Sequence, residues 1–290
     1  LLTAAGKPKV GLCVMVVAGV ANIALDALFI IVFQWGLAGA ALATAVSEVL
    51  GGAIPFLYFA RPNSSTLRLG RPLIDVRALG RVCVNGSSEL VSNLSMSLVS
   101  MVYNFQLMAY IGPDGVAIYG VIQYVAWIAV SLLMGFTVGS SPIISYHYGA
   151  KNSAELKGLF RTCLGVMVAG GVLITVLVHL FAHPLAAVFV GYDPALCEMT
   201  VAALGEYSLA FIFVGVSIFG SAFFTALNNG LVSALISFLR TLVFECAAVM
   251  FLPAIIGVDG IWLSIVVAEI ASMFLTGGFL VGLRKHYDYA

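Results

Sequence analysis

The feature that most constrains this 290-residue chain is the length of its uncharged stretches. Residues 116–150, 162–192 and 207–239 contain no Asp, Glu, Lys or Arg. Each stretch exceeds the roughly 20 residues that a helix needs to cross the hydrocarbon core of a bilayer. Apolar residues occupy both faces instead of alternating, which excludes the strands of an outer-membrane barrel. We therefore expect an all-α polytopic membrane protein.

Composition and motif content restrict the function classes further. Hydrophobic residues make up 62% of the chain and charged residues 9%, whereas a soluble domain carries about 25% charged residues. The 13 basic residues form no run longer than two, so we expect no nucleic-acid partner. Catalytic motifs are absent and the five cysteines lack the spacing of metal ligands. We therefore expect neither an enzyme, nor a metal site, nor a cofactor.

Gly, Pro and charge clusters divide the apolar sequence into eight expected transmembrane helices. The longest connection, residues 61–81, is polar and carries five arginines, and we interpret it as a linker between two bundles. Residues 1–60 then form the last two helices of an N-terminal lobe, and residues 82–290 form a six-helix C-terminal lobe. The expected spans are residues 10–33, 37–60, 84–111, 116–147, 160–182, 199–228, 231–256 and 258–283.

Twelve of the 13 basic residues fall on alternate connections, which predicts an orientation. The opposite connections contain no Lys or Arg. Because basic loops stay in the cytoplasm, we expect both ends of the chain and the 61–81 linker on the cytoplasmic side of a bacterial plasma membrane.

The second expected span and the last one share an internal sequence repeat. The pattern G-x-x-G-x-x-L-x-x-x-V-x-E, from Gly36 to Glu48, recurs at one constant offset from Gly257 to Glu269. Such a duplication is typical of transporters, and it predicts a two-lobed bundle of six plus six helices in parallel repeats. Four partner helices would then precede Leu1, so we expect a fragment that lacks about 150 residues.

A carboxylate inside the first expected span is a candidate cation site. Asp26 lies about 24 Å along this span from its cytoplasmic end, and Asn22 precedes it by about one helical turn. We interpret the pair as a cation-coupling site, because intramembrane carboxylates are costly and commonly functional. The alternative is a structural hydrogen bond between helices, made by a protonated Asp26.

A polar stripe runs along the third expected span for about 28 Å. Its members recur at intervals of three or four residues, and only Glu89 among them is charged. We interpret the stripe as one wall of a water-filled substrate cavity; a polar seam packed against a neighbouring helix is the alternative. The stripe consists of Asn85, Glu89, Asn93, Ser97, Ser100 and Asn104.

The fourth expected span offers aromatic and amide side chains to a substrate. Polar, aromatic and small residues recur there at intervals of four, and a flat or cationic molecule would be held by stacking and cation–π contacts. Ordinary helix packing is the alternative. The residues are Tyr119, Gln123, Trp127, Ser131, Gly135 and Gly139.

Arg240 is the only basic residue inside an expected span. In an α-helix, Arg240 and Glu245 would be about 140° apart, so we expect Arg240 to pair with a carboxylate on another span, such as Glu269. We interpret these three residues as an intramembrane ion-pair or gating site; direct substrate contact is the alternative. Glu48 and Glu206 are weaker candidates for such a site.

Several of these segments resemble the multidrug and toxic compound extrusion (MATE) transporters, within a superfamily that also holds lipid and polysaccharide flippases. They include NIALD at 22–26, GLAGAALAT at 36–44, NGSSE at 85–89 and SPIISYHYGAKN at 141–152. The resemblance implies a twelve-helix, two-lobed antiporter that exports organic compounds in exchange for protons or sodium ions. It also implies cation-coupling roles for Asn22, Asp26 and Glu89. Ala27 stands where the family commonly has a proline.

We therefore expect a multidrug efflux antiporter that works by rocking-type alternating access, with H⁺ or Na⁺ as the coupling ion. Its expected partners are small cationic or amphipathic organic substrates and the lipid bilayer, and it is expected to be monomeric. The fragment is not expected to transport by itself. Two alternatives stay open: a flippase for lipid-linked saccharides on the same fold, and a non-transporting membrane scaffold.

Overall fold

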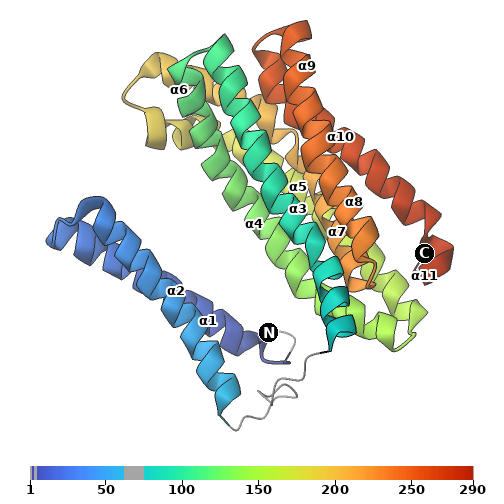
Figure 1. The fold of residues 1–290 in the computed structure, drawn as a ribbon. Helices are drawn as coiled ribbons and strands as arrows, with labels where there is room; N and C mark the ends of the chain where they lie inside the picture. The colour runs from blue at the N-terminus through green and yellow to red at the C-terminus, as the bar shows by residue number, and fades with distance from the viewer. Residues whose placement is uncertain (1, 3–4, 62–74, 290) are drawn as a thin grey trace. The chain divides into compact units, whose positions relative to one another are not determined.

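The computed structural model describes residue 2, residues 5–61 and residues 75–289. The chain forms two compact units, Leu1–Ile74 and Asp75–Ala290, which are described separately. All regular secondary structure in the described residues is helical, in agreement with the predicted all-α class (Figure 1). The assignment of the units to two lobes stays a prediction.

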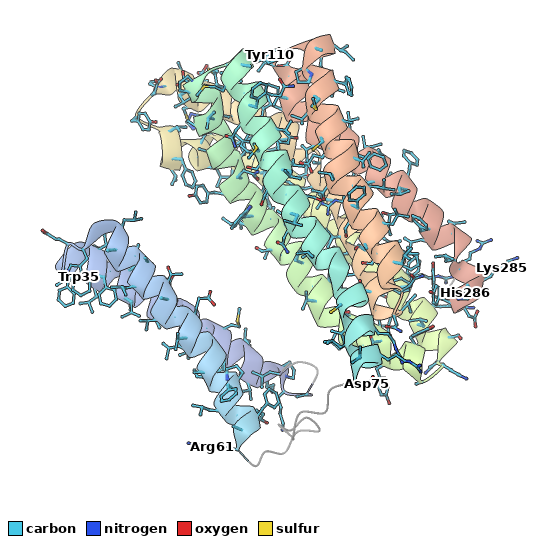
Figure 2. All side chains as sticks on the ribbon, in the orientation of Figure 1. Trp35, Arg61, Asp75, Tyr110, Lys285 and His286 are labelled. Atoms are coloured by element: carbon cyan, nitrogen blue, oxygen red, sulfur yellow. The ribbon has the colours of Figure 1, made fainter. Side chains whose placement is uncertain are left out.

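Unit 1 is a helical hairpin. Its first arm is α1 (Pro8–Asp26) continued by the π-helix η1 (Ala27–Val32), and its second arm is α2 (Gly36–Ala60). Trp35 lies at the turn and Arg61 at the open end (Figure 2). Gly36 has a φ of +55°, which L side chains rarely adopt. A Cβ on Gly39 would lie 3.0 Å from the Phe29 Cβ, so this glycine allows the two arms to pack closely.

Unit 2 is a bundle of long helices (Figure 1). The long helix α3 runs from the end marked by Asp75 to the end marked by Tyr110 (Figure 2). The elements are α3 (Val76–Tyr110), α4 (Pro113–Gly149), α5 (Ser153–Val190), α6 (Pro194–Ser208), α7 (Phe211–Ala226), α8 (Gly230–Phe238), the π-helix η2 (Leu239–Glu245), α9 (Cys246–Ile256), α10 (Asp259–Gly282) and α11 (Arg284–Tyr287).

Three turns of unit 2 start their next helix with a side-chain cap. The side-chain oxygens of Asn152, Asp193 and Asn229 accept hydrogen bonds from backbone N–H groups in the first turns of α5, α6 and α8. These caps satisfy donors that would otherwise have no partner at a helix start. Short polar residues in the connections thus explain why the helices begin where they do.

The predicted spans need two corrections. The sixth expected span is not one straight helix, because α6 and α7 meet at a bend of 45°. Thr175 of α5 donates a hydrogen bond to the Ser208 carbonyl at this break, and Gly171 lets the start of α7 approach α5. The helix that contains the third expected span, α3, begins earlier than expected, at Val76, so Arg77 and Arg81 are helical.

The described residues include six helices, or helix runs, that are long and apolar enough to cross a membrane, and the bent α6–α7 pair makes up to seven. The helix α3 is not among them, because polar residues lower its hydropathy. The predicted number of eight spans therefore stays a prediction. Most of the expected linker, residues 62–74, lies outside the described residues.

Two apolar cores stabilise unit 2. One core contains Tyr103, Tyr119, Tyr207 and the first half of α10, and the other contains Phe219, Phe223 and the last turns of α10. Between them, α10 carries the buried polar residues Glu269, Ser272 and Thr276. A polar layer therefore separates the two cores near the middle of the bundle. Polar and charged side chains cost the most free energy at this depth of a membrane protein.

Candidate functional site

The polar layer in the middle of unit 2 contains an ion pair. The Nε and Nη2 atoms of Arg240 each lie 2.7 Å from the Glu269 Oε1 atom. The Glu269 side chain is 1% exposed and that of Arg240 is 23% exposed. The interhelical pair expected from the sequence is thus present in the structure; its gating role stays a prediction.

A π-helix brings a second carboxylate to the same arginine. Arg240 and Glu245 both belong to η2, near its two ends. Backbone hydrogen bonds in a π-helix join residues five apart, so residues i and i+5 lie on nearly the same side. Glu245 interacts electrostatically with both Arg240 and Glu269. The segment is therefore not the expected α-helix, but no salt bridge joins Arg240 to Glu245 among the described residues, in agreement with the prediction that these two residues do not pair.

Three buried tyrosines interact with the second carboxylate. Tyr103 of α3, Tyr119 of α4 and Tyr207 of α6 each interact electrostatically with Glu245. The rings of Tyr103 and Tyr119 stack with centroids 5.0 Å apart. We name Arg240, Glu245, Glu269 and these three tyrosines the central cluster. Sequence reasoning missed Tyr103 and Tyr207, because tyrosines in an apolar helix have the same spacing as packing residues.

The residues predicted on the fourth span do not form one surface. Tyr119 is buried, and its hydroxyl group accepts a hydrogen bond from Gln123 Nε2. Trp127, in contrast, is 69% exposed on unit 2. Four residues make slightly more than one turn of an α-helix, so a stripe with this spacing drifts by about 40° per step. Over two steps this drift carries the pattern from the core of unit 2 to its outside.

The polar stripe of α3 is exposed at Asn93 and Ser97 and half-buried at Ser100 and Asn104. Asn93 and Ser97 are exposed, and Ser97 Oγ donates to the Asn93 carbonyl. Asn104 is half-buried and donates to the Ser100 carbonyl. The side chains of Asn85 and Glu89 lie outside the described part of the structure. The cavity wall and the coupling role of Glu89 therefore stay predictions.

The carboxylate predicted in unit 1 occupies a distinctive backbone position. Asp26 is the last residue of α1, directly before η1, and it is half-buried. Its Oδ1 atom is buried and has no hydrogen-bond partner in the described part of the chain. Asn22, one turn earlier on α1, is also half-buried and does not donate to that oxygen.

The described residues contain no group of three or more His, Cys, Asp or Glu side chains that could hold a metal ion. His179, four residues before His183 on α5, contacts the Thr175 carbonyl and the Ser208 hydroxyl, each at 3.1 Å.

Comparison with protein families gives one match over the described bundle. A family model described as MatE matches residues 90–248, which is more than half of the chain. The multidrug export protein MepA of Staphylococcus saprophyticus is 24% identical over 273 residues. That match covers 91% of this chain and 58% of the relative, so the chain spans about 58% of the length of this curated relative.

Solved structures share the fold. A MATE crystal structure in complex with MaL6 superposes with a TM-score of 0.89 at 21% identity, covering 99% of this chain and 64% of that one. An outward-facing multidrug resistance transporter of the MATE family gives a TM-score of 0.88 at 22% identity, with the same two coverages. These similarities agree with the predicted MATE-type helical bundle.

Proposed function

The chain belongs to the MatE family, and on this premise we propose that the whole protein exports small organic compounds in exchange for protons or sodium ions. MatE proteins are transporters and not enzymes. A transporter acts within a membrane, which accounts for the long apolar helices of this chain. The identity of the coupling ion, the exchange of this ion for substrate, and the class of substrate are the proposed parts.

Asp26 is the observation that supports cation exchange most strongly. A half-buried carboxylate inside a span, with an oxygen that no described donor satisfies, is unfavourable as a purely structural feature. A proton or a sodium ion from outside would neutralise it, and the binding energy would bias the equilibrium between two conformations. Asn22 on the same face of α1 is placed to share the cation, and Glu89 is proposed as a further coupling residue.

Exposed side chains on unit 2 favour an amphipathic organic compound as the substrate. Asn93 and Ser97 present polar groups on α3, while Trp127 presents an exposed aromatic ring on α4. An aromatic ring binds flat or cationic molecules by stacking and cation–π attraction, and amides and hydroxyls add hydrogen bonds. We assign this combination to substrate contact during rocking of the two halves of a MATE-type protein.

The distribution of charge supports the orientation. Lys151, Lys157 and Arg161 lie in the connection between α4 and α5 or the first turns of α5. Asp75 lies at the same end of unit 2 as Lys285 and His286, whereas Tyr110 lies at the other end (Figure 2). We place the basic end in the cytoplasm of a bacterium, with the protein acting as a monomer.

The proposal is tested with the full-length protein in liposomes. An imposed proton or sodium gradient should drive uptake or release of a fluorescent organic cation, and Asp26→Asn should reduce that flux to the level of empty liposomes. Asp114→Asn, at an exposed carboxylate in the first turn of α4, is the matched control and should transport normally. Equal fluxes in the wild type and Asp26→Asn, at equal amounts of protein, would contradict the proposal.

A further inference from the structure

The central cluster has more acidic than basic groups. It holds two carboxylates, Glu245 and Glu269, and one guanidinium, Arg240. With these three groups ionised, its net charge is −1. An unbalanced charge in the middle of a membrane protein is expensive, so the cluster needs one further positive charge to become neutral.

The hydrogen bonds show where the balance is incomplete. Both donor atoms of Arg240 contact the same oxygen of Glu269, and the other oxygen, Oε2, is buried without a partner in the described chain. The hydroxyl groups of Tyr103 and Ser272 are also buried without partners among the described residues. These three buried polar groups of unit 2 thus have no hydrogen-bond partner among the described residues.

We propose that the central cluster is a second protonation site of the protein, with Glu245 as the group that takes up the proton. Glu245 is the carboxylate of the cluster without a salt bridge to a described residue, so a proton on it costs no ion pair and brings the net charge of the cluster to zero. The inference deepens the proposed cation-driven export, on which it rests. The step is simple acid–base chemistry: hydronium transfers one proton to the carboxylate and leaves water.

The surroundings of Glu245 suit reversible protonation. The helix η2 packs against α3, α8, α9 and α10. These elements contribute Tyr103 from α3, Cys246 from α9 and Glu269 from α10 as titratable neighbours, and α8 contributes none. Tyr119 and Tyr207 are the other neighbours. Glu245 therefore has one cationic neighbour, Arg240, and one anionic neighbour, Glu269.

The second site would be separate from Asp26 in chain position and in chemistry. Asp26 is a single carboxylate next to an amide, whereas Glu245 shares a guanidinium with another carboxylate. Arg240 also couples protonation of Glu245 to the contact between η2 and α10. Once Glu245 is neutral, Arg240 is attracted only by Glu269, and the ion pair between η2 and α10 becomes stronger.

The site is tested by infrared difference spectroscopy of the full-length protein in lipid nanodiscs, between alkaline and acidic buffer. The wild type should show, at acidic pH, a carbonyl band of a protonated carboxylic acid that Glu245→Gln abolishes. Glu245→Asp keeps the carboxyl group and should shift the band, so the assignment does not depend on one variant folding. Glu155→Gln, at an exposed position on α5, is the control and should leave the band unchanged.

Two outcomes would overturn the inference. One is a band that neither Glu245 variant alters. The other is a band that follows sodium concentration at constant pH, which would indicate a sodium site. The spectroscopy needs no transport, so the site and the proposed function can fail separately. Absence of gradient-driven flux with an intact Glu245 band would contradict only the function.

Discussion

The hairpin of unit 1, Pro8–Ala60, and the hairpin of unit 2, Gly230–Gly282, share a backbone design but differ in their polar groups. Gly36 and Gly257, which begin the two copies of the sequence repeat, both have positive φ. Gly39 and Gly260 both face the preceding arm so closely that a Cβ would touch its backbone. The duplicated sequence pattern therefore corresponds to a duplicated turn and a duplicated close approach of helices.

The polar groups do not follow the repeat. Glu48 and Glu269 are equivalent, but the position equivalent to Arg240 in the first hairpin is Gly19, and the position equivalent to Glu245 is Ala24. Asp26, conversely, corresponds to Ala247. The first hairpin thus carries two carboxylates, Asp26 and Glu48, and no arginine, whereas the second carries Arg240 together with Glu245 and Glu269. Duplication preserved the turns, whereas the buried charges diverged.

The two π-helices lie at or beside the polar residues of each hairpin and do not occupy equivalent positions of the repeat. The helix η1 begins directly after Asp26, whereas η2 contains Arg240 and Glu245. The repeat makes η2 equivalent to the segment from Ala18 to Ala24, which is regular α-helix in unit 1. Single π-helical turns are frequent at functional sites because they change which residues share a face. This link supports Asp26 and the central cluster as the functional parts of the two hairpins.

Glu269→Gln should have the largest effect on stability, because it leaves the Arg240 guanidinium without its partner between the two cores. Breaking a buried ion pair in this way costs about 3–5 kcal/mol. The free energy of unfolding in detergent, from denaturant titration of the full-length protein, measures the loss. Glu48→Gln is the matched change in the other hairpin and should cost far less, since no arginine occupies the equivalent position. Equal losses would remove the proposed difference between the hairpins.

Gly260→Ala should have the next largest effect, because its Cβ would lie 2.7 Å from the Leu252 backbone carbonyl. Overpacking of this kind costs about 1–3 kcal/mol. Gly39→Ala tests the equivalent position, where the nearest backbone atoms are 3.1 Å away and the cost should be smaller. Thermal unfolding of both variants gives the order. A tolerated Gly260→Ala would show that the close approach is not required.

Asp288→Asn should have the smallest effect and one that depends on pH. Side-chain hydrogen bonds from Ser153 and Lys157 lower the pKa of Asp288 below its ordinary value. A carboxylate with a lowered pKa in the folded state stabilises it at pH above the ordinary value, and the contribution disappears as pH falls through the lowered pKa. Thermal stability of the wild type should therefore slightly exceed that of Asp288→Asn at neutral pH and equal it in strong acid. A difference that grows on acidification would contradict this.

The sequence predicted the features that depend on residue type alone. A lone arginine in a span needs a carboxylate, and the structure joins Arg240 to Glu269. The sequence repeat predicts paired hairpins, and both glycines that begin the repeat have positive φ. The helical class and the MATE-type bundle could also be inferred, because charge-free stretches and specific segments leave few other folds.

Features that depend on local backbone hydrogen bonding could not be predicted. Hydrophobic periodicity does not distinguish an α-helix from a π-helix, so the π-helix that contains Arg240 and Glu245 was not predicted. Nor does it show that Thr175 would satisfy the Ser208 carbonyl and permit a bend between α6 and α7. Tyr103 was missed because a buried tyrosine resembles a packing residue until its neighbours are known.

The most direct test of the difference between the hairpins counts the protons that each one takes up. Proton uptake by the full-length protein in lipid nanodiscs is measured with a pH indicator after a step to lower pH, for the wild type, Asp26→Asn, Glu245→Gln and the double variant. Two independent sites predict that each single change removes one proton and that the losses add in the double variant. Uptake by Glu245→Gln equal to that of the wild type, with the double variant equal to Asp26→Asn, would contradict a protonation site in the second hairpin.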